Sequence, residues 1–420
     1  MPPNIENQAG NTRRRKTGDD ASSSSLTAAV GKEQATMDQS DTKKRQKTNI
    51  DPSPTPFATL DGQKEETTPD IATTTTTPTT PTYKDISSAL CAVDLSGTDK
   101  VTRDEVKQAL IDLYNWRLDC RSNVDSATKL TQVFVEDCAG IQRFLNFMKE
   151  NQKDTELMVG SSYVLREFLD DDDNEEHLAS TIKVAMKFVA YNGIELMVSI
   201  TSDIIIGKLN GIHLQVLVGI WDVFYNSIIN INQSNMVDMD KIVPIIASGI
   251  STLDVINKIE DDKDVLVDIK TNVIASFGEI MKNAEMIDKE EFQGKNIFHV
   301  CVRALKASDG GDSSWKYSDQ LWANASEFFN ECCKENRTLL SKETDFELIV
   351  PFLIQFIKED ANSAWDYDAF GTLKKAYDII GRRKMLKNAG IFEVLGRVAV
   401  NSTLVLDAKN EAKDLMKRLF

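Results

Sequence analysis

The 420-residue sequence has little of what marks a membrane-spanning or secreted protein. No apolar run approaches the roughly 18 residues of a membrane-spanning helix, so we expect no membrane segment. The first seven residues lack the apolar stretch of a signal peptide. The six cysteines include no C-x-x-C pair, so we expect neither a zinc site nor a disulfide framework. Free thiols in a reducing compartment are the simpler interpretation.

The sequence also lacks the linear signatures of an enzyme. It contains neither a G-x-x-x-x-G-K-S/T loop nor a G-x-G-x-x-G turn. Its three histidines, His177, His213 and His299, are far apart and form no metal-binding pair, so we assign them structural or surface roles. We therefore expect a non-enzymatic protein without a cofactor or metal. An enzyme whose active residues come from loops without a motif remains an alternative.

Residues 1–82 have few large apolar side chains. Phe57 is their only aromatic residue, and eight of the ten prolines lie in residues 1–81. All five tryptophans lie after residue 115. A segment of this composition cannot bury enough surface to offset the entropy of ordering its backbone. We predict a disordered tail over 1–82 and a folded part over 83–420.

Two basic clusters stand out in this tail. They consist of Arg13, Arg14, Arg15 and Lys16, and of Lys43, Lys44, Arg45 and Lys47. Short basic runs in an extended chain suit the acidic groove of a nuclear import receptor. The alternative is that they only keep the tail solvated. We treat them as a candidate nuclear-localisation signal and expect the protein in the nucleus, the cytoplasm or both.

From Tyr83 onward, apolar residues recur with a period close to 3.6. One such stripe consists of Leu321, Ala325, Phe328 and Cys332. This spacing is typical of amphipathic helices, and convincing alternation with period two is absent. We predict an all-α fold, with the two thiols at Cys332 and Cys333 buried on that stripe.

Glycine and proline indicate where helices should end and begin. Gly193 follows Asn192 at the end of a helical pattern, where glycine favours a stop. Pro244 and Pro351 suit the first turn of a helix, because the N–H that proline lacks has no intrahelical partner there. We therefore expect a helix to end at Gly193 and two helices to begin close to the prolines.

Similar segments recur along the helical part, each around one apolar anchor residue. The anchors are Ile141, Ile194, Val243, Ile297, Val350 and Ile391, at spacings of 53, 49, 54, 53 and 41 residues. Ile86, 55 residues before the first, is a candidate seventh anchor. A period of this size is typical of an α-solenoid, whose units bury their apolar faces only by stacking on neighbours. We predict about six to seven degenerate repeats over 83–420.

Three anchors follow a glycine, as Gly140-Ile141, Gly193-Ile194 and Gly390-Ile391. These segments resemble the Gly-Gly-Ile-x-x-Leu-Val loop that precedes the long third helix of an armadillo repeat. The resemblance covers most of 84–420 through short motifs, and most spacings exceed a standard armadillo unit, so a HEAT-like or mixed solenoid is the alternative. It implies a right-handed α-solenoid that serves as a scaffold or adaptor and binds a partner segment along its groove.

The tryptophan positions differ from those of one group of armadillo proteins. Nuclear import adaptors of the armadillo type carry a ladder in which Trp precedes Asn by four residues. Here Trp221 precedes Asn226 by five residues and Trp322 precedes Asn324 by two. We therefore expect a likeness in architecture and no binding of nuclear-localisation peptides.

The charge of the folded part suggests the chemistry of a partner. Residues 85–420 hold 38 basic and 54 acidic side chains and carry the whole net charge of −16. Such a surface repels a phosphate backbone, so we expect no direct contact with nucleic acid. Complementary charge favours a basic or amphipathic segment of another protein. Association with a second copy is a further alternative.

Residues 94–105 suggest an alternative function, that of a calcium-responsive regulator. Positions 1, 3, 5 and 12 of an EF-hand loop would fall on Asp94, Ser96, Thr98 and Glu105. However, Asp99 stands where the sharp turn needs glycine. Thr102 and Glu105 also fit a capping box that begins a helix, and this is the interpretation we favour.

The densest charge in the chain is the acidic run from Asp170 to Glu176. It is a candidate site for a basic peptide or for weakly held divalent cations. Like charges packed this closely more often form a solvated loop. We expect such a loop before a helix that begins at His177.

Overall fold

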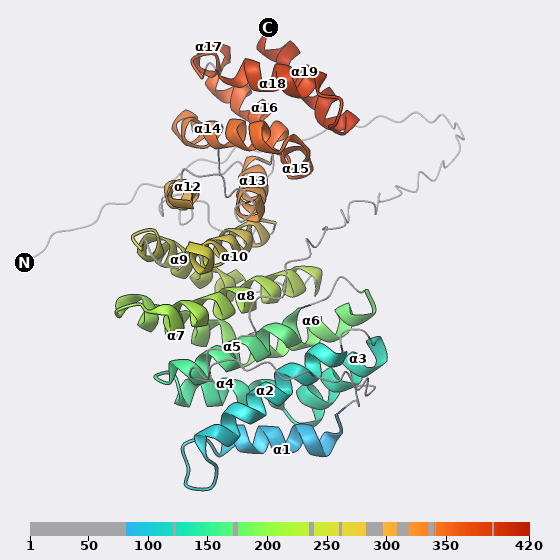
Figure 1. Cartoon of the computed structure of the whole chain (residues 1–420), viewed down its shortest axis with the longest axis vertical. Coiled ribbons are helices and arrows are strands. Elements are labelled where there is room, and N and C mark those ends of the chain that lie inside the picture. Colours follow the sequence, from blue (N-terminus) through green and yellow to red (C-terminus); the bar gives the residue numbers. More distant parts are fainter. Residues whose placement is uncertain are drawn as a thin grey trace, which may run out of the picture. The chain divides into compact units, whose positions relative to one another are not determined.

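The computed structural model describes residues that all belong to the unit Pro54–Phe420. These residues are 81–120, 123–170, 175–234, 239–259, 263–282, 297–308, 319–334, 340, 342–388 and 390–420. Within these ranges the chain forms α-helices and one π-helical turn, and no strand occurs (Figure 1). The prediction of an all-α fold is confirmed. Residues 1–80 of the predicted tail, which include both basic clusters, and residues 171–174 of the acidic run lie outside these ranges.

One set of helices carries the anchor residues, and we name it the anchored row. Each member packs on the next in chain order: α1 (Tyr83–Asp94), α4 (Gly140–Glu150), α7 (Gly193–Ile206), α9 (Met239–Ile256), α12 (Ile297–Ser308), α14 (Glu343–Glu359) and α18 (Gly390–Val400). Every anchor is buried except Val243, whose neighbour Ile242 is buried in its place. The anchors therefore mark equivalent packing positions in successive helices.

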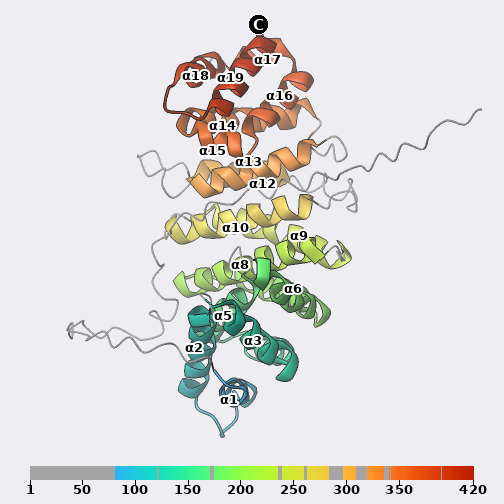
Figure 2. The same cartoon turned by 90° about the vertical axis from the view of Figure 1, so that its right-hand side faces the viewer.

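A second set lies beside the first, and we name it the polar row. It consists of α2 (Arg103–Cys120), α5 (Thr155–Leu169), α8 (Gly211–Ser234), α10 (Lys263–Met281), α13 (Asp319–Cys333), α16 (Ala369–Ile380) and α19 (Leu406–Leu419). These helices also pack successively, as both views show (Figures 1 and 2). The remaining elements are α3 (Val124–Gln132), the π-helical turn Val133–Asp137, α6 (Glu175–Ala190), α15 (Ala361–Asp366) and α17 (Arg382–Met385). Large apolar side chains such as Trp221, Phe277 and Phe328 fill the core.

A helix ends just before Asn192-Gly193, as expected, because α6 ends at Ala190, but Gly193 also begins the next helix. Asn192 takes the left-handed conformation, with φ 60°, and Gly193 is the first residue of α7. A Cβ atom on Gly193 would lie 2.4 Å from the ring of Phe188, and one on Gly140 would lie 2.7 Å from Phe134. Glycine is required at both positions because an aromatic ring packs directly on the helix start.

The two prolines lie inside helices, so the expected helix starts were wrong. Pro244 is in the second turn of α9, and Pro351 is near the middle of α14. Each leaves one carbonyl, four residues earlier, without its intrahelical hydrogen bond. Those carbonyls belong to Asp240 and Glu347, which are exposed, so water can solvate them. Both helices therefore extend past the proline.

By length and composition, α8 could cross a membrane. The sequence analysis found no such segment because it considered uninterrupted apolar runs, and α8 includes Asp222 and Asn226. Trp221 and Phe224 are fully buried within the protein. Burial between neighbouring helices accounts for the apolar composition of α8 without a bilayer.

Candidate functional site

Polar side chains form a stripe that passes from helix to helix along the polar row. On α8 the partly exposed positions include Gln215, Asp222, Tyr225, Ile229 and Asn232, whose spacings of seven, three, four and three residues place them on one side of the helix. We name the stripe the polar face and define it by Tyr163, Arg166, Gln215, Asp222, Asn232, Asp264, Asp268, Asn272, Glu279, Lys282, Glu327 and Asn330. Its members come from four consecutive helices, α5, α8, α10 and α13, and from Lys282, just past the end of α10.

One cluster on this face joins three helices through Asp222. Arg166 Nη1 on α5 lies 3.3 Å from Asp222 Oδ2 on α8, and Asn272 Nδ2 on α10 donates to Asp222 Oδ1 at 2.5 Å. Arg166 Nη2 is also 2.8 Å from Glu167 Oε1, whose side chain is 0% exposed. The guanidinium therefore neutralises two carboxylates and fixes the spacing of α5 and α8.

Burial and charge oppose each other in this cluster, and burial dominates at Asp222, whose pKa is raised despite the nearby guanidinium. Burial by itself would lower the pKa of Arg166, but the charges of Asp222 and Glu167 outweigh it and raise that pKa. The guanidinium also lies 4.7 Å from the centroid of the Tyr163 ring, a cation–π contact. Tyr163 Oη in turn donates to Gln215 Oε1 at 3.1 Å, and burial raises the pKa of Tyr163. Arg166 is thus a permanent cation with every partner fixed.

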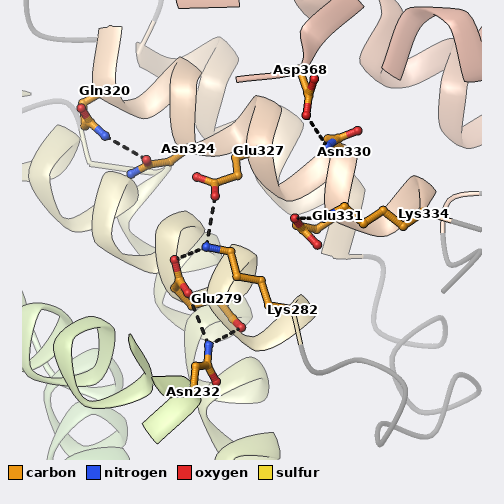
Figure 3. A network of polar contacts seen from close by, with 10 residues as sticks. All are labelled: Asn232, Glu279, Lys282, Gln320, Asn324, Glu327, Asn330, Glu331, Lys334 and Asp368. Atoms are coloured by element: carbon orange, nitrogen blue, oxygen red, sulfur yellow. Dashed lines mark hydrogen bonds and ion pairs between the residues drawn. The ribbon is translucent and has the colours of Figure 1, made fainter. Parts of the chain in front are cut away.

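A second cluster joins α8, α10 and α13 (Figure 3). Asn232 Nδ2 donates to the main-chain oxygen of Glu279 at 3.0 Å. Lys282 Nζ lies 2.7 Å from Glu279 Oε1 and 3.2 Å from Glu327 Oε1. Burial would lower the pKa of Lys282, but the charges of Glu279 and Glu327 exceed this effect and raise it. Here too a cation lies between two carboxylates of neighbouring helices.

The same pattern extends toward α16. Asn330 Nδ2 on α13 donates to Asp368 Oδ2, just before α16, at 3.1 Å (Figure 3). The partners that join successive helices are separated in sequence by 56 residues for Arg166 and Asp222, 50 for Asp222 and Asn272, and 38 for Asn330 and Asp368. These separations are close to the spacings of the anchors. The polar contacts therefore repeat with the period of the packing.

Two carboxylates on the polar face differ from the rest. Asp264 and Asp268 on α10 are exposed, and neither has a cationic partner within the part of the chain that the structure describes. Neighbouring protein partly desolvates the carboxyl of Asp268, and together with the charges of Asp222 and Asp264 this raises its pKa to about 6. Among the described side chains, this part of α10 therefore carries two exposed carboxylates without a cationic partner.

The loop considered as a calcium site forms a helix cap. The main-chain N–H of Thr102 donates to Glu105 Oε2 at 2.7 Å, and the N–H of Glu105 donates to Thr102 Oγ1 at 3.3 Å. Asp94 Oδ2 lies 2.6 Å from Arg143 Nη2. The predicted capping box is confirmed. Because Asp94 and Glu105, the two carboxylates at candidate ligand positions, already have partners, the geometry does not favour the calcium alternative.

The other residues singled out from the sequence form no site. His299 is exposed, His213 is half-buried, and the side chain of His177 lies outside the description. Cys332 and Cys333 are buried as predicted, and desolvation raises the pKa of Cys333. Among the described residues, no group of three or more His, Cys, Asp or Glu side chains could hold a metal ion. The helix expected to begin at His177 begins at Glu175.

Comparison with protein-family models, curated proteins and solved structures finds no match for this chain. The armadillo resemblance therefore remains a prediction from the anchors. The sequence analysis also missed the polar face. The signal that could have found it is the recurrence, about 50 residues apart, of polar residues such as Arg166, Asp222 and Asn272 in the segments after each anchor.

Proposed function

We propose that this chain is a non-enzymatic scaffold: a right-handed α-solenoid of armadillo or HEAT type that binds a basic segment of a partner protein along the polar face. The observation that carries the proposal is the pair of exposed carboxylates, Asp264 and Asp268, in the middle of a polar stripe. The successive packing of both rows supports the solenoid part of the proposal, because each helix pair relies on its neighbours for burial.

The charged residues of the polar face fall into two groups, those that pair with one another and those available to a partner. The charges of Arg166, Asp222, Lys282 and Glu279 neutralise one another and hold the helices at fixed spacing. Carboxylates such as Asp264 and Asp268, which have no cationic partner among the described residues, attract a cationic segment and raise its association rate. The net charge of −16 disfavours nucleic acid as the partner.

Nuclear import is a separate part of the proposal, and it rests on the basic clusters of the tail. Replacing Lys43, Lys44, Arg45 and Lys47 by alanine in the tagged full chain should shift it from nucleus to cytoplasm. An unchanged distribution after replacement of both clusters would contradict this part alone.

Affinity capture from native extract tests the binding function. The full chain and its D264N/D268N variant serve as baits, with mass spectrometry as the readout. The matched control is E195Q/D203N, which removes two exposed carboxylates from α7 in the anchored row. We expect a partner in near-stoichiometric amount on the wild type and control, about tenfold less on D264N/D268N, and release at high salt. No enriched protein, or equal recovery on both variants, would overturn the proposal.

A further inference from the structure

Charge is distributed unevenly along the helical part of the chain. Residues 85–373 hold 27 basic and 49 acidic side chains, a net charge of −22. Residues 374–420 hold 11 basic and 5 acidic side chains, a net charge of +6. Helices α16 to α19 therefore form a cationic region of an otherwise acidic protein.

The short helix α17 is fixed in place by two of its residues. Met385 is 1% exposed and anchors the turn in the core. Lys384 Nζ pairs with Glu343 and lies 3.1 Å from Glu347, both on α14. Because successive residues of a helical turn point in different directions, fixing these two determines where the others project.

The other residues around α17 face solvent. Arg382, Arg383 and Lys387 are exposed, and none has a carboxylate partner among the residues described. Ile379 and Leu386 beside them are 42% and 40% exposed. We name these five residues the basic patch. It combines three cations that have no carboxylate partner among the described residues with two partly exposed apolar side chains.

We propose that the basic patch docks on the polar face of a second copy of this chain, at Asp264 and Asp268. The inference rests on the proposed function in one respect, that the polar face is a binding surface. Charge complementarity favours this occupant: the patch is cationic, and the matching anions are the two exposed carboxylates that have no cationic partner within the described ranges. A long polyanion or an anionic membrane would instead meet the charge of −22 on the rest of the helical part.

The proposed contact is reciprocal. In an antiparallel pair, the patch of each copy reaches the polar face of the other, so the assembly closes as a dimer with two identical contacts. Val265, beside Asp264, is partly exposed and offers an apolar surface to Ile379 and Leu386. The dimer would cover the same carboxylates that a basic partner uses, so the two would compete.

Sedimentation velocity of the full chain at low and high salt tests this contact. We expect a dimer at low ionic strength and a monomer at high ionic strength. The variants R382E/R383E/K387E and D264K/D268K should each associate at least about tenfold more weakly. Combining all five substitutions in one chain makes the patch acidic and positions 264 and 268 basic, which should restore the dimer.

A matched control separates this contact from a general effect of net charge. K149E/K183E/K208E makes the same change in charge as the patch variant at exposed lysines elsewhere, and it should leave the dimer intact. Circular dichroism of each variant verifies its fold. A monomer at every concentration in low salt would overturn the proposal, as would an unaffected patch variant or a folded five-residue variant that stays monomeric. A monomeric wild type that binds phosphatidylserine vesicles or an acidic peptide would also overturn it.

The experiments distinguish a failure of the proposed dimer from a failure of the proposed function. A monomeric wild type that still captures a partner through Asp264 and Asp268 overturns the dimer alone. A dimer with the expected salt and charge behaviour, in a protein that captures nothing, overturns the proposed function alone.

Discussion

The anchored row and the polar row meet the same requirement, helix stacked on helix, in different ways. In the anchored row an aliphatic residue recurs at each step and is buried, as at Ile141, Ile194 and Ile297. In the polar row the linking contact changes each time, from Arg166 with Asp222 to Asn330 with Asp368. Burial of an aliphatic side chain can be repeated unchanged, whereas each polar contact must satisfy its own donors and acceptors.

This difference shows where function can lie. The buried anchors of the first row are needed for packing and have little freedom to vary toward a partner. A row whose polar contacts differ from step to step can leave selected charges without a cationic partner among the described residues, as at Asp264 and Asp268. We therefore expect substitutions in the anchored row to affect stability alone, and those in the polar row to divide between stability and binding.

The largest expected effect is at Arg166. R166M should lower the free energy of unfolding by about 3 kcal/mol, because it leaves the buried carboxylate of Glu167 and that of Asp222 without their cation. Urea denaturation measures the loss. The double variant R166M/E167Q should recover part of it, since one of the stranded charges is removed. Equal losses in the two variants would show that the buried charge is not the cause.

The anchored row offers a matched pair of glycines at the same motif position. G193A should lose about 2 kcal/mol, because its Cβ would lie 2.4 Å from the Phe188 ring. G390A has no neighbouring atom within 4 Å of the added Cβ and should stay within about 0.5 kcal/mol of the wild type. Equal thermal stability of the two variants would contradict a packing role for Gly193.

The fold class and the anchors could be predicted because both follow from local periodicity. Burial every three to four residues appears in the sequence itself, and so does the capping box of Thr102 and Glu105, which spans three residues. Helix boundaries were less predictable. Phe188 packing on Gly193 and the continuation of α14 through Pro351 are tertiary effects that override the local preference.

The candidate site could not be predicted from the sequence. The acidic excess was evident, but which carboxylates lack a partner depends on contacts such as that of Arg166 with Asp222, 56 residues away. Asp268 and Glu279 are both acidic residues of α10, so the sequence alone does not show which of them has a cationic partner. In the structure, Lys282 pairs with Glu279, and no cation pairs with Asp268 within the described ranges.

A smaller loss of stability is expected at Lys282, which lies between two carboxylates as Arg166 does. K282M should cost about 1 kcal/mol in urea denaturation, because the side chain is 37% exposed and solvent can reach the charges left behind. The control K334M, whose side chain is 46% exposed and pairs with Glu331, should cost less. If K282M loses as much stability as R166M, side-chain exposure does not determine how much each substitution costs.

The smallest effect on stability is expected at Asp268. Here the informative result is whether the substitution D268N raises or lowers the stability at a given pH. The pKa of about 6 in the folded state is above the value near 3.9 for an unfolded aspartate. Between these values the folded state binds more protons, so this carboxyl stabilises the fold at low pH and loses that contribution as pH rises through about 6. D268N should therefore match the wild type near pH 4 and be slightly more stable at pH 7, by less than about 1 kcal/mol because the group is exposed.

Urea denaturation of D268N, wild type and the control D203N from about pH 4 to pH 7.5 measures this difference. A difference that does not change with pH would contradict the raised pKa of Asp268. The same variant should also be a poorer bait for a basic partner. A substitution that increases stability and weakens capture would indicate that Asp268 is maintained for binding, whereas the loss of stability in R166M would indicate that Arg166 is maintained for the fold.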